Sequence, residues 1–164
     1  MPVGRDEFSA LVNRLDYPMY VVTTAARDGM AGCLVGFTSQ VSIDPPLFLV
    51  CLSKENHTLE LASLATHLAV HFLGPDNVDL AHLFGEQTGD EVDKFVRCDW
   101  SLGPHGMPIL DRTPAFFVAR IVERYDFGDH VGHLLEPEKV AKRRAIAGML
   151  SYLDVRDLEP GHDA

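Results

Sequence analysis

The sequence has too few basic residues for a general nucleic-acid-binding protein. Lysine and arginine number 14, against 24 aspartate and glutamate residues, and the formal net charge is −10. Binding to a phosphate backbone requires a basic face, and an anionic membrane surface attracts the same positive charge. We therefore expect neither nucleic acid nor a membrane among the partners of this protein.

Long apolar runs and paired cysteines are also missing. No stretch approaches the roughly 20 residues that cross a bilayer, and residues 1–12 lack the apolar region of a signal peptide. The three cysteines, Cys33, Cys51 and Cys98, are an odd number without close spacing. This usage is typical of reduced thiols, so we expect a cytoplasmic protein.

Nucleotide-binding and metal-binding motifs are absent as well. The sequence contains no G-x-G-x-x-G, no Walker A loop and no G-x-S-x-G elbow. His67 and His71 are four residues apart on a predicted strand, which separates them by about 13 Å along the chain. His130 and His133 would point to opposite faces of a strand. Neither pair has the geometry of a metal site, and we expect no metal.

The pattern of apolar residues predicts a mainly β protein. A length of 164 residues with 46% apolar residues suits one domain, residues 1–164, with a substantial core. The expected strands are 19–24, 30–35, 47–52, 68–73, 115–125 and 131–135, with a hairpin turn at Asp28-Gly29. Helices are expected over 6–14, from Asn56 or Thr58 through Leu64, over 78–84 and over 90–96. The early strands follow one another too closely for crossover helices, so we expect a small β-barrel with accessory helices.

A hydroxyl-rich segment, FTSQVSIDPPL, leads into one of these strands. Pro45 and Pro46 cannot donate ladder hydrogen bonds, so we expect the preceding residues to form a loop with free amides. The hydroxyls of Thr38, Ser39 and Ser42 would add to a rim rich in donors. The rim suits a flat polar ligand, but a surface loop with local side-chain-to-backbone bonds explains the pattern equally.

Two further stretches carry polar groups at the ends of predicted strands. The segment SKENHTLE leads into a helix, whose free N–H groups and Lys54 would favour a phosphate, although simple helix capping is an alternative. In FGDHV, a tight turn explains Gly128-Asp129. His130 is then either a site residue or a solvent-exposed turn histidine.

Taken in order, these motifs resemble the flavin reductase family. Residues 37–47 are similar to its FTSxS-(L/I)-DPP-L segment, and further likenesses are Asn56-His57-Thr58, Phe72-Leu73, the triplet DKF at 93–95 and GDH at 128–130. The resemblance extends over about residues 5–136. Gln40 departs from it, since small apolar residues are common there, and so does the tail from about residue 137. The basic residues of this tail could alter substrate choice, cover the site or form the solvated face of a short helix.

The resemblance implies an FMN-binding split barrel and a set of site residues. Residues lining the isoalloxazine ring would be Thr38, Ser39, Gln40, Val41 and Ser42. The ribityl phosphate would be held by Ser53, Lys54, Asn56 and Thr58. The cofactor would be bordered by His71, Phe72 and Leu73, and by Lys94 and Phe95 from the other subunit or a neighbouring segment. His130 would be the catalytic residue on the nicotinamide side.

The resemblance also implies an activity and partners. The expected reaction is hydride transfer from NADH or NADPH to FMN or FAD, which requires two rings held face to face within near-attack distance. Backbone N–H groups would stabilise the negative charge of the reduced flavin. A homodimer and a partner flavin-dependent monooxygenase that receives reduced flavin are expected. The alternatives are a flavin-binding electron-carrier module without its own NAD(P)H turnover, and a relative that no longer binds flavin.

Overall fold

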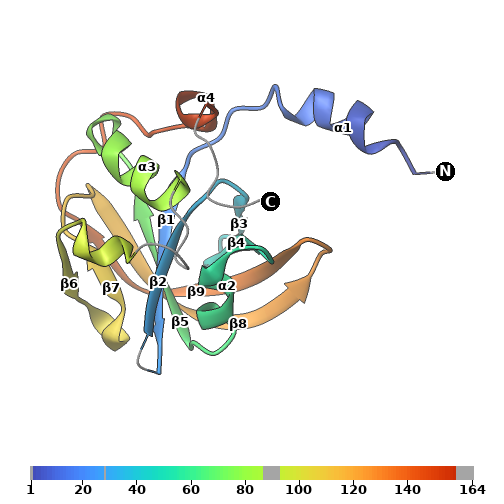
Figure 1. Ribbon diagram of the computed structural model, residues 1–164. Coiled ribbons are helices and arrows are strands. Elements are labelled where there is room, and N and C mark those ends of the chain that lie inside the picture. Colours follow the sequence, from blue (N-terminus) through green and yellow to red (C-terminus); the bar gives the residue numbers. More distant parts are fainter. Residues whose placement is uncertain (1, 28, 87–92, 158–164) are drawn as a thin grey trace.

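The computed structural model describes residues 2–27, 29–86 and 93–157 (Figure 1). Seven antiparallel strands form one sheet in the order β2-β1-β5-β8-β9-β4-β3, and β6 and β7 form a separate hairpin. The strands are β1 Tyr20–Ala26, β2 Gly29–Val35, β3 Thr38–Ser42, β4 Leu47–Ser53, β5 His67–Phe72, β6 Trp100–Leu102, β7 Pro108–Leu110, β8 Ala115–Asp126 and β9 His130–Lys142. The expected mainly β fold is confirmed, although β2 and β3 remain as the two edges of the sheet.

The helices are short, and the first of them extends away from the sheet (Figure 1). The α-helices are α1 Arg5–Val12, α2 His57–Ala62, α3 Val78–Glu86 and α4 Tyr152–Val155. Single 3₁₀ turns are η1 Pro75–Asn77, η2 Lys94–Val96 and η3 Pro104–Gly106. Within the described part of the chain, no helix has both the length and the apolar character needed to span a bilayer. Asp28, in the expected hairpin turn, lies outside the described residues. So does part of the helix expected over residues 90–96, and the described part of that segment, from residue 93, contains only the 3₁₀ turn η2.

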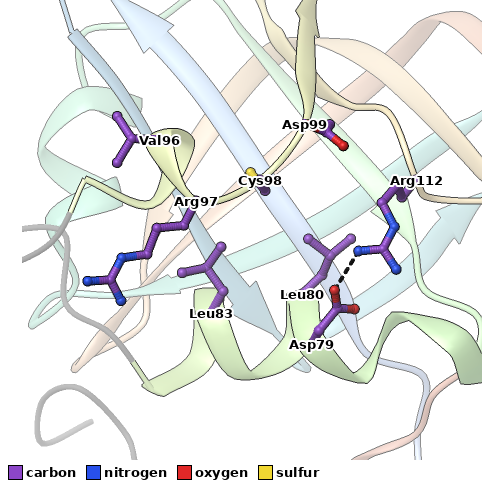
Figure 2. A pocket seen from close by; sticks show the side chains of 8 residues that line it. All are labelled: Asp79, Leu80, Leu83, Val96, Arg97, Cys98, Asp99 and Arg112. Atoms are coloured by element: carbon purple, nitrogen blue, oxygen red, sulfur yellow. Dashed lines mark hydrogen bonds and ion pairs between the residues drawn. The ribbon is translucent and has the colours of Figure 1, made fainter.

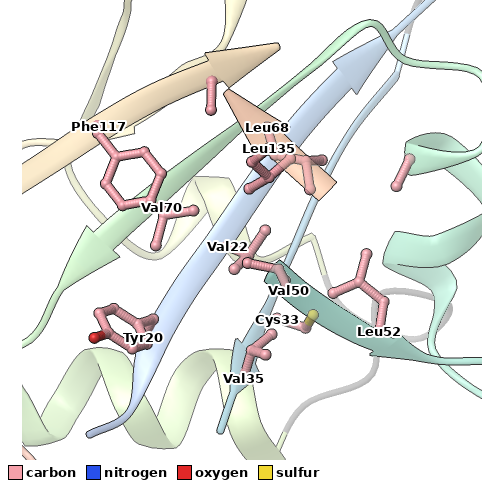
Figure 3. Packing of buried hydrophobic residues seen from close by; sticks show 12 residues of the cluster. Tyr20, Val22, Cys33, Val35, Val50, Leu52, Leu68, Val70, Phe117 and Leu135 are labelled. Carbon is pink, nitrogen blue, oxygen red and sulfur yellow. The ribbon is translucent and has the colours of Figure 1, made fainter. Parts of the chain in front are cut away.

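The core lies on both faces of the sheet. Val21 and Val22 are adjacent in β1 and both fully buried, but they belong to different clusters because successive strand residues point to opposite faces. Val22 packs in the cluster of Figure 3 with Val50 and Leu135, whereas Val21 packs beneath α3. Burial on both faces explains why β1 is apolar without alternation.

Strands β8 and β9 form a long hairpin within the sheet. Gly128 makes the turn with a φ of 127°, a backbone conformation that L side chains rarely adopt. Sequence periodicity predicted a strand over residues 131–135 only, but β9 continues to Lys142. The proposed short basic helix in this tail is therefore wrong, because residues 137–142 are hydrogen-bonded to β8. Irregular pairing, including a register shift near Pro137, interrupts the apolar alternation that would have revealed the strand.

The rest of the tail is tied to the body of the protein. The Arg143 guanidinium donates hydrogen bonds to the carbonyls of Leu110, Asp111 and Thr113 at 2.6, 3.1 and 3.2 Å. The Arg144 guanidinium bonds both carboxylate oxygens of Asp76 at 3.1 and 2.9 Å. These two cations therefore anchor the chain segment after β9.

Candidate functional site

The hydroxyl-rich segment predicted to be a loop is the edge strand β3. Thr38 pairs with Val50, and the register shifts between Gln40 and Ser42, which leaves Val41 without a partner on β4. The expectation that all of these amides are free of sheet pairing is therefore wrong. Thr and Ser tolerate an extended backbone, and the two prolines come after the strand rather than within it. An edge strand still directs half of its backbone groups away from its neighbour, so the outer edge of β3 offers donors and acceptors.

The side chains of β3 make only local polar contacts. Ser39 Oγ donates to the carbonyl of Gln40 at 3.0 Å, and Gln40 Nε2 donates to the carbonyl of Ser42 at 3.4 Å. Ser39, Gln40 and Val41 are exposed, and Thr38 and Ser42 are half-buried. These contacts are replaceable, because a ligand can offer equivalent partners to exposed groups.

The second predicted stretch forms the start of α2. Asn56 is its N-cap, and Asn56 Oδ1 accepts a hydrogen bond from the backbone N–H of Thr58 at 2.9 Å. Ser53 Oγ accepts from the backbone N–H of Glu55 at 3.2 Å. The predicted capping is confirmed for Asn56, whereas Thr58 is buried inside the protein. The helix ends at Ala62 rather than at Leu64.

Lys54, beside the start of this helix, forms an ion pair with Asp126 that a ligand can replace. Its ammonium donates to both carboxylate oxygens of Asp126 at 2.9 Å, and the two side chains are 40% and 69% exposed. The hydrogen bond from Lys54 holds the pKa of Asp126 below its usual value, assisted by the backbone N–H of Gly128. Because exposed ion pairs contribute little free energy, a phosphate can compete with Asp126 for this ammonium.

The third stretch meets the other two at the start of β9. His130 is the strand partner of Ser53, and the backbone N–H of Lys54 donates to the carbonyl of Asp129 at 2.9 Å. His130 Nδ1 donates to the Asp129 carboxylate at 2.8 Å, which holds the pKa of Asp129 below its usual value. Tertiary structure thus brings together three segments that are far apart in the sequence. We call residues 37–42, 53–58 and 129–130 the ligand junction.

Exposed apolar side chains accompany these polar groups. The ring of Phe37 lies 4.9 Å from the ring of His130, measured between centroids, and Phe37 is 56% exposed. Val41 is also exposed, and Ile43 is 84% exposed. A flat ligand with apolar faces and a polar border therefore meets suitable groups of both kinds. Sequence reasoning did not assign a role to Phe37 or Asp126, and their position could be known only from the fold.

Three other predicted residues are part of the β5 region of the core. His71 is fully buried, its Nδ1 donates to the carbonyl of Val21, and its Nε2 accepts from the backbone N–H of Leu110, both at 3.0 Å. Burial lowers the pKa of His71 to about 4. Leu73 is also fully buried, and Phe72 packs edge-on against Tyr20 with centroids 5.2 Å apart. These contacts give His71 and Leu73 structural roles and leave no exposed atom of His71 for a cofactor.

Lys94 and Phe95 are likewise buried within this chain. Lys94 is only 5% exposed. Its ammonium donates to the carbonyls of Gly32 and Phe84, both at 3.1 Å. Burial lowers the pKa of this ammonium. Phe95 packs edge-on against the rings of Phe84 and Trp100, with both centroid distances 5.8 Å. The fold therefore does not bring Lys94 or Phe95 to the ligand junction.

A surface pocket lies elsewhere, between α3 and the segment that follows η2 (Figure 2). Its volume is about 500 Å³, and an ion pair between Asp79 and Arg112 lies at its wall. Burial and the surrounding carboxylates raise the pKa of the Cys98 thiol in this pocket to about 11, so the thiol stays protonated. No residue of the ligand junction lines this pocket.

Comparison with known proteins agrees with the fold and with the motifs. The chain is 34% identical over 114 residues to a probable flavin reductase of Rhizobium meliloti, which covers 67% of this chain and 36% of that protein. It is 30% identical over 129 residues to the FMN reductase (NADH) RutF of Stutzerimonas stutzeri, covering 79% of this chain and 74% of RutF. A third relative, 28% identical over 130 residues, is the reductase component of a flavin-dependent trigonelline monooxygenase of Acinetobacter baylyi, with coverages of 77% and 39%.

A solved structure shares the whole fold. The flavin reductase domain protein of Arthrobacter sp. FB24 superposes with a TM-score of 0.83 at 22% identity, covering 91% of both chains. This chain matches about one third of the length of the Rhizobium relative. Residues 12–156 match the family of the flavin reductase like domain. The chain therefore belongs to the flavin reductase-like family, as its motifs predicted.

Proposed function

We propose that this chain is an NAD(P)H-dependent flavin reductase that binds FMN or FAD at the ligand junction. The observation that carries the proposal is the convergence of the three motif segments: Ser53 and His130 are strand partners, and the ring of Phe37 lies 4.9 Å from the ring of His130. Family membership and the relative named FMN reductase (NADH) support the activity. NADH or NADPH is the co-substrate.

The chemistry of the junction fits a flavin. Exposed hydroxyl and amide groups of Ser39 and Gln40 suit the polar border of the isoalloxazine ring, and Phe37 suits its apolar face. Lys54, released from Asp126, supplies one positive charge for the phosphate. The remaining polar residues of this set are Thr38, Ser42, Ser53 and Asn56. We assign no cofactor contact to His71 or Lys94, because their polar atoms bond to the protein interior.

The protein residues have to hold and orient two rings. A bound flavin would supply the hydride acceptor, so the chain needs no nucleophile of its own. His130, fixed by its hydrogen bond to Asp129 and its contact with Phe37, positions the nicotinamide side. Outward backbone N–H groups of β3, other than that of Thr38, which donates to the Gly36 carbonyl at 3.0 Å, would stabilise developing negative charge without moving, because the sheet holds them in place.

The proposed assembly is a homodimer. Helix α1 buries none of its residues in this chain, and Leu11 and Phe8 are 69% and 59% exposed. In Figure 1, α1 extends away from the sheet. Exposed apolar surface of this kind is typical of an interface, and a second chain covering Val41 and Ile43 would also exclude water from the junction.

The proposed physiological partner is a flavin-dependent monooxygenase that consumes reduced flavin. The likeness to the reductase component from Acinetobacter baylyi supports this partner. A cytoplasmic location agrees with three cysteines that are all free thiols.

Anaerobic stopped-flow spectroscopy tests the activity. The purified protein is mixed with FMN, FAD or riboflavin and then with NADH or NADPH, and the flavin absorbance is followed. We expect bleaching of the oxidised flavin at a rate that depends on protein concentration. Flavin binding without bleaching by either nicotinamide would instead indicate an electron-carrier module and overturn the reductase proposal.

A further inference from the structure

Away from the ligand junction, two histidines and a glutamate converge on one point. His67 Nε2 and His105 Nε2 lie 3.2 and 3.0 Å from the same oxygen, Glu138 Oε2. The ligand atoms of the three side chains all lie within 4.8 Å of one another. His67 begins β5, His105 belongs to η3 between β6 and β7, and Glu138 lies on β9. The cluster therefore joins the small hairpin to the main sheet.

Two irregularities of the backbone deliver these side chains. Ala119 pairs with Pro137 and Val118 with Lys139, so Glu138 is the extra residue of a β-bulge. His105 has a φ of 57°, in the left-handed region that non-glycine residues rarely adopt. Bulges and left-handed residues are enriched near functional sites, where they can redirect a side chain. Both irregularities in this region point a potential metal ligand to the same place.

We propose that His67, His105 and Glu138 bind a divalent transition-metal ion, with Zn²⁺ as the best match. Two imidazoles and one carboxylate are a common zinc ligand set, and a water completes the four positions. A tetrahedral ion about 2.0 Å from each donor requires donors roughly 3.3 Å apart. The two distances to Glu138 Oε2 are already close to that separation. Softer thiolate ligands are not involved, which also makes Co²⁺ and Ni²⁺ suitable probes.

Neighbouring groups prepare the donors. Thr66 Oγ1 lies 2.8 Å from His67 Nδ1, so the hydroxyl can accept from Nδ1–H and leave the Nε2 lone pair for the metal. Arg120 Nε lies 3.6 Å from Glu138 Oε1, the other carboxylate oxygen, which favours binding through Oε2 alone.

The metal requires one adjustment of the side chains. The rings of His67 and His105 are stacked, with centroids 3.8 Å apart and an interplanar angle of 11°. Parallel rings do not aim both Nε2 lone pairs at one point, so one ring has to turn. His67 is buried, whereas the His105 side chain is 48% exposed and can rotate toward the solvent side.

This site is separate from the proposed flavin site. Glu138 and His130 are eight positions apart on β9, which corresponds to about 26 Å along an extended strand. The ion would hold η3 against β5 and β9 and so stabilise the small hairpin. From the sequence alone we expected no metal, because we considered only pairs of histidines along one strand, and His67, His105 and Glu138 are far apart in the sequence.

Spectroscopic titration with Co²⁺ tests the proposal. Untagged protein is dialysed against a chelator and titrated with Co²⁺, whose visible d–d bands become intense in a four-coordinate site. We expect saturation at one ion per chain and loss of the bands when Zn²⁺ is added. A melting temperature raised by roughly 5 to 10 °C is expected at a Zn²⁺ concentration one hundred times the dissociation constant. Absence of saturable bands would overturn the proposal.

Three variants make the test specific to this site. His105→Ala and Glu138→Gln change partly exposed side chains and should weaken Co²⁺ binding by roughly tenfold or more. His82→Ala is the matched control, since His82 is also 48% exposed and lies 3.1 Å from a carboxylate, that of Glu86. The control should bind like the unmodified protein. Equal affinity in all of these proteins, or equal loss in the control, would show binding elsewhere and overturn the assignment.

Discussion

The ring of Phe37, just before β3, packs against the ring of His130, the first residue of β9, with centroids 4.9 Å apart. This contact links two of the three motif segments of the ligand junction. Phe37 is 56% exposed in spite of this contact, so part of its side chain remains accessible to a ligand.

We predict that Phe37→Ala weakens flavin binding. Loss of an aromatic contact costs about 0.5–1.5 kcal/mol, which corresponds to a rise in dissociation constant of roughly 2- to 10-fold. Quenching of flavin fluorescence during titration with the protein measures this constant. Leu102→Ala, an exposed apolar change in β6, is the control and should leave the constant unchanged. Equal affinity of the Phe37 variant and the unmodified protein would remove Phe37 from the site.

His130→Ala should slow hydride transfer more than it weakens flavin binding. The side chain lies between Asp129 and Phe37, so its removal leaves the nicotinamide side without an oriented ring. Stopped-flow reduction at saturating flavin gives the rate, and fluorescence titration gives the flavin affinity of the same variant. An unchanged reduction rate would exclude His130 from the nicotinamide side.

Lys54→Met should discriminate between flavins by their phosphate. A charge-assisted hydrogen bond contributes about 1.5–3 kcal/mol, so the dissociation constant for FMN should rise roughly tenfold or more. Riboflavin has no phosphate and serves as the internal control, because its affinity should stay nearly constant. Removing Asp126, the present partner of Lys54, by Asp126→Asn should not weaken FMN binding. Equal losses for FMN and riboflavin would contradict a phosphate contact.

His71 should make the folded protein sensitive to acid. Its pKa is lowered from 6.5 to about 4, so between these values the unfolded chain binds more protons than the folded one. The free energy of unfolding should therefore rise as pH increases from 4 to 6.5, and fall on acidification by about 3 kcal/mol. Urea unfolding at several pH values measures this slope.

A variant isolates the contribution of His71 to that slope. His71→Gln should be less stable at neutral pH, because two buried hydrogen bonds are disturbed, but its stability should vary less with pH. His133, whose pKa burial also lowers, accounts for part of the remaining slope. The exposed control His82→Gln should keep the full pH dependence. Identical slopes for all three proteins would show that His71 does not titrate on unfolding.

Leu11→Asp should shift the proposed dimer toward the monomer. The helix α1 has no buried residue in this chain, so the substitution should leave the fold intact while placing a charge in the interface. Sedimentation velocity across a range of protein concentrations measures the dissociation. Leu102→Asp, another exposed leucine in β6, is the control. A monomeric unmodified protein would contradict the proposed assembly.

Local sequence predicted much of the fold. The apolar runs in β1, β4 and β5 and the long pattern in β8 identify strands because period and composition are local properties. The two short strands β6 and β7 were not predicted, since three residues are too few to show a period. The extension of β9 was missed because Pro137 and the bulged Glu138 interrupt the pattern.

The amino-acid sequence by itself determined the family, through motifs that keep their order along the chain, and it determined that a helix begins near Asn56 or Thr58. Only the tertiary structure decided which polar groups are available. It buried His71 and Lys94 among backbone carbonyls and amides, and it brought Phe37 to His130. The physical reason is that burial and long-range strand pairing depend on the whole sheet, whereas a motif describes only neighbours along the chain.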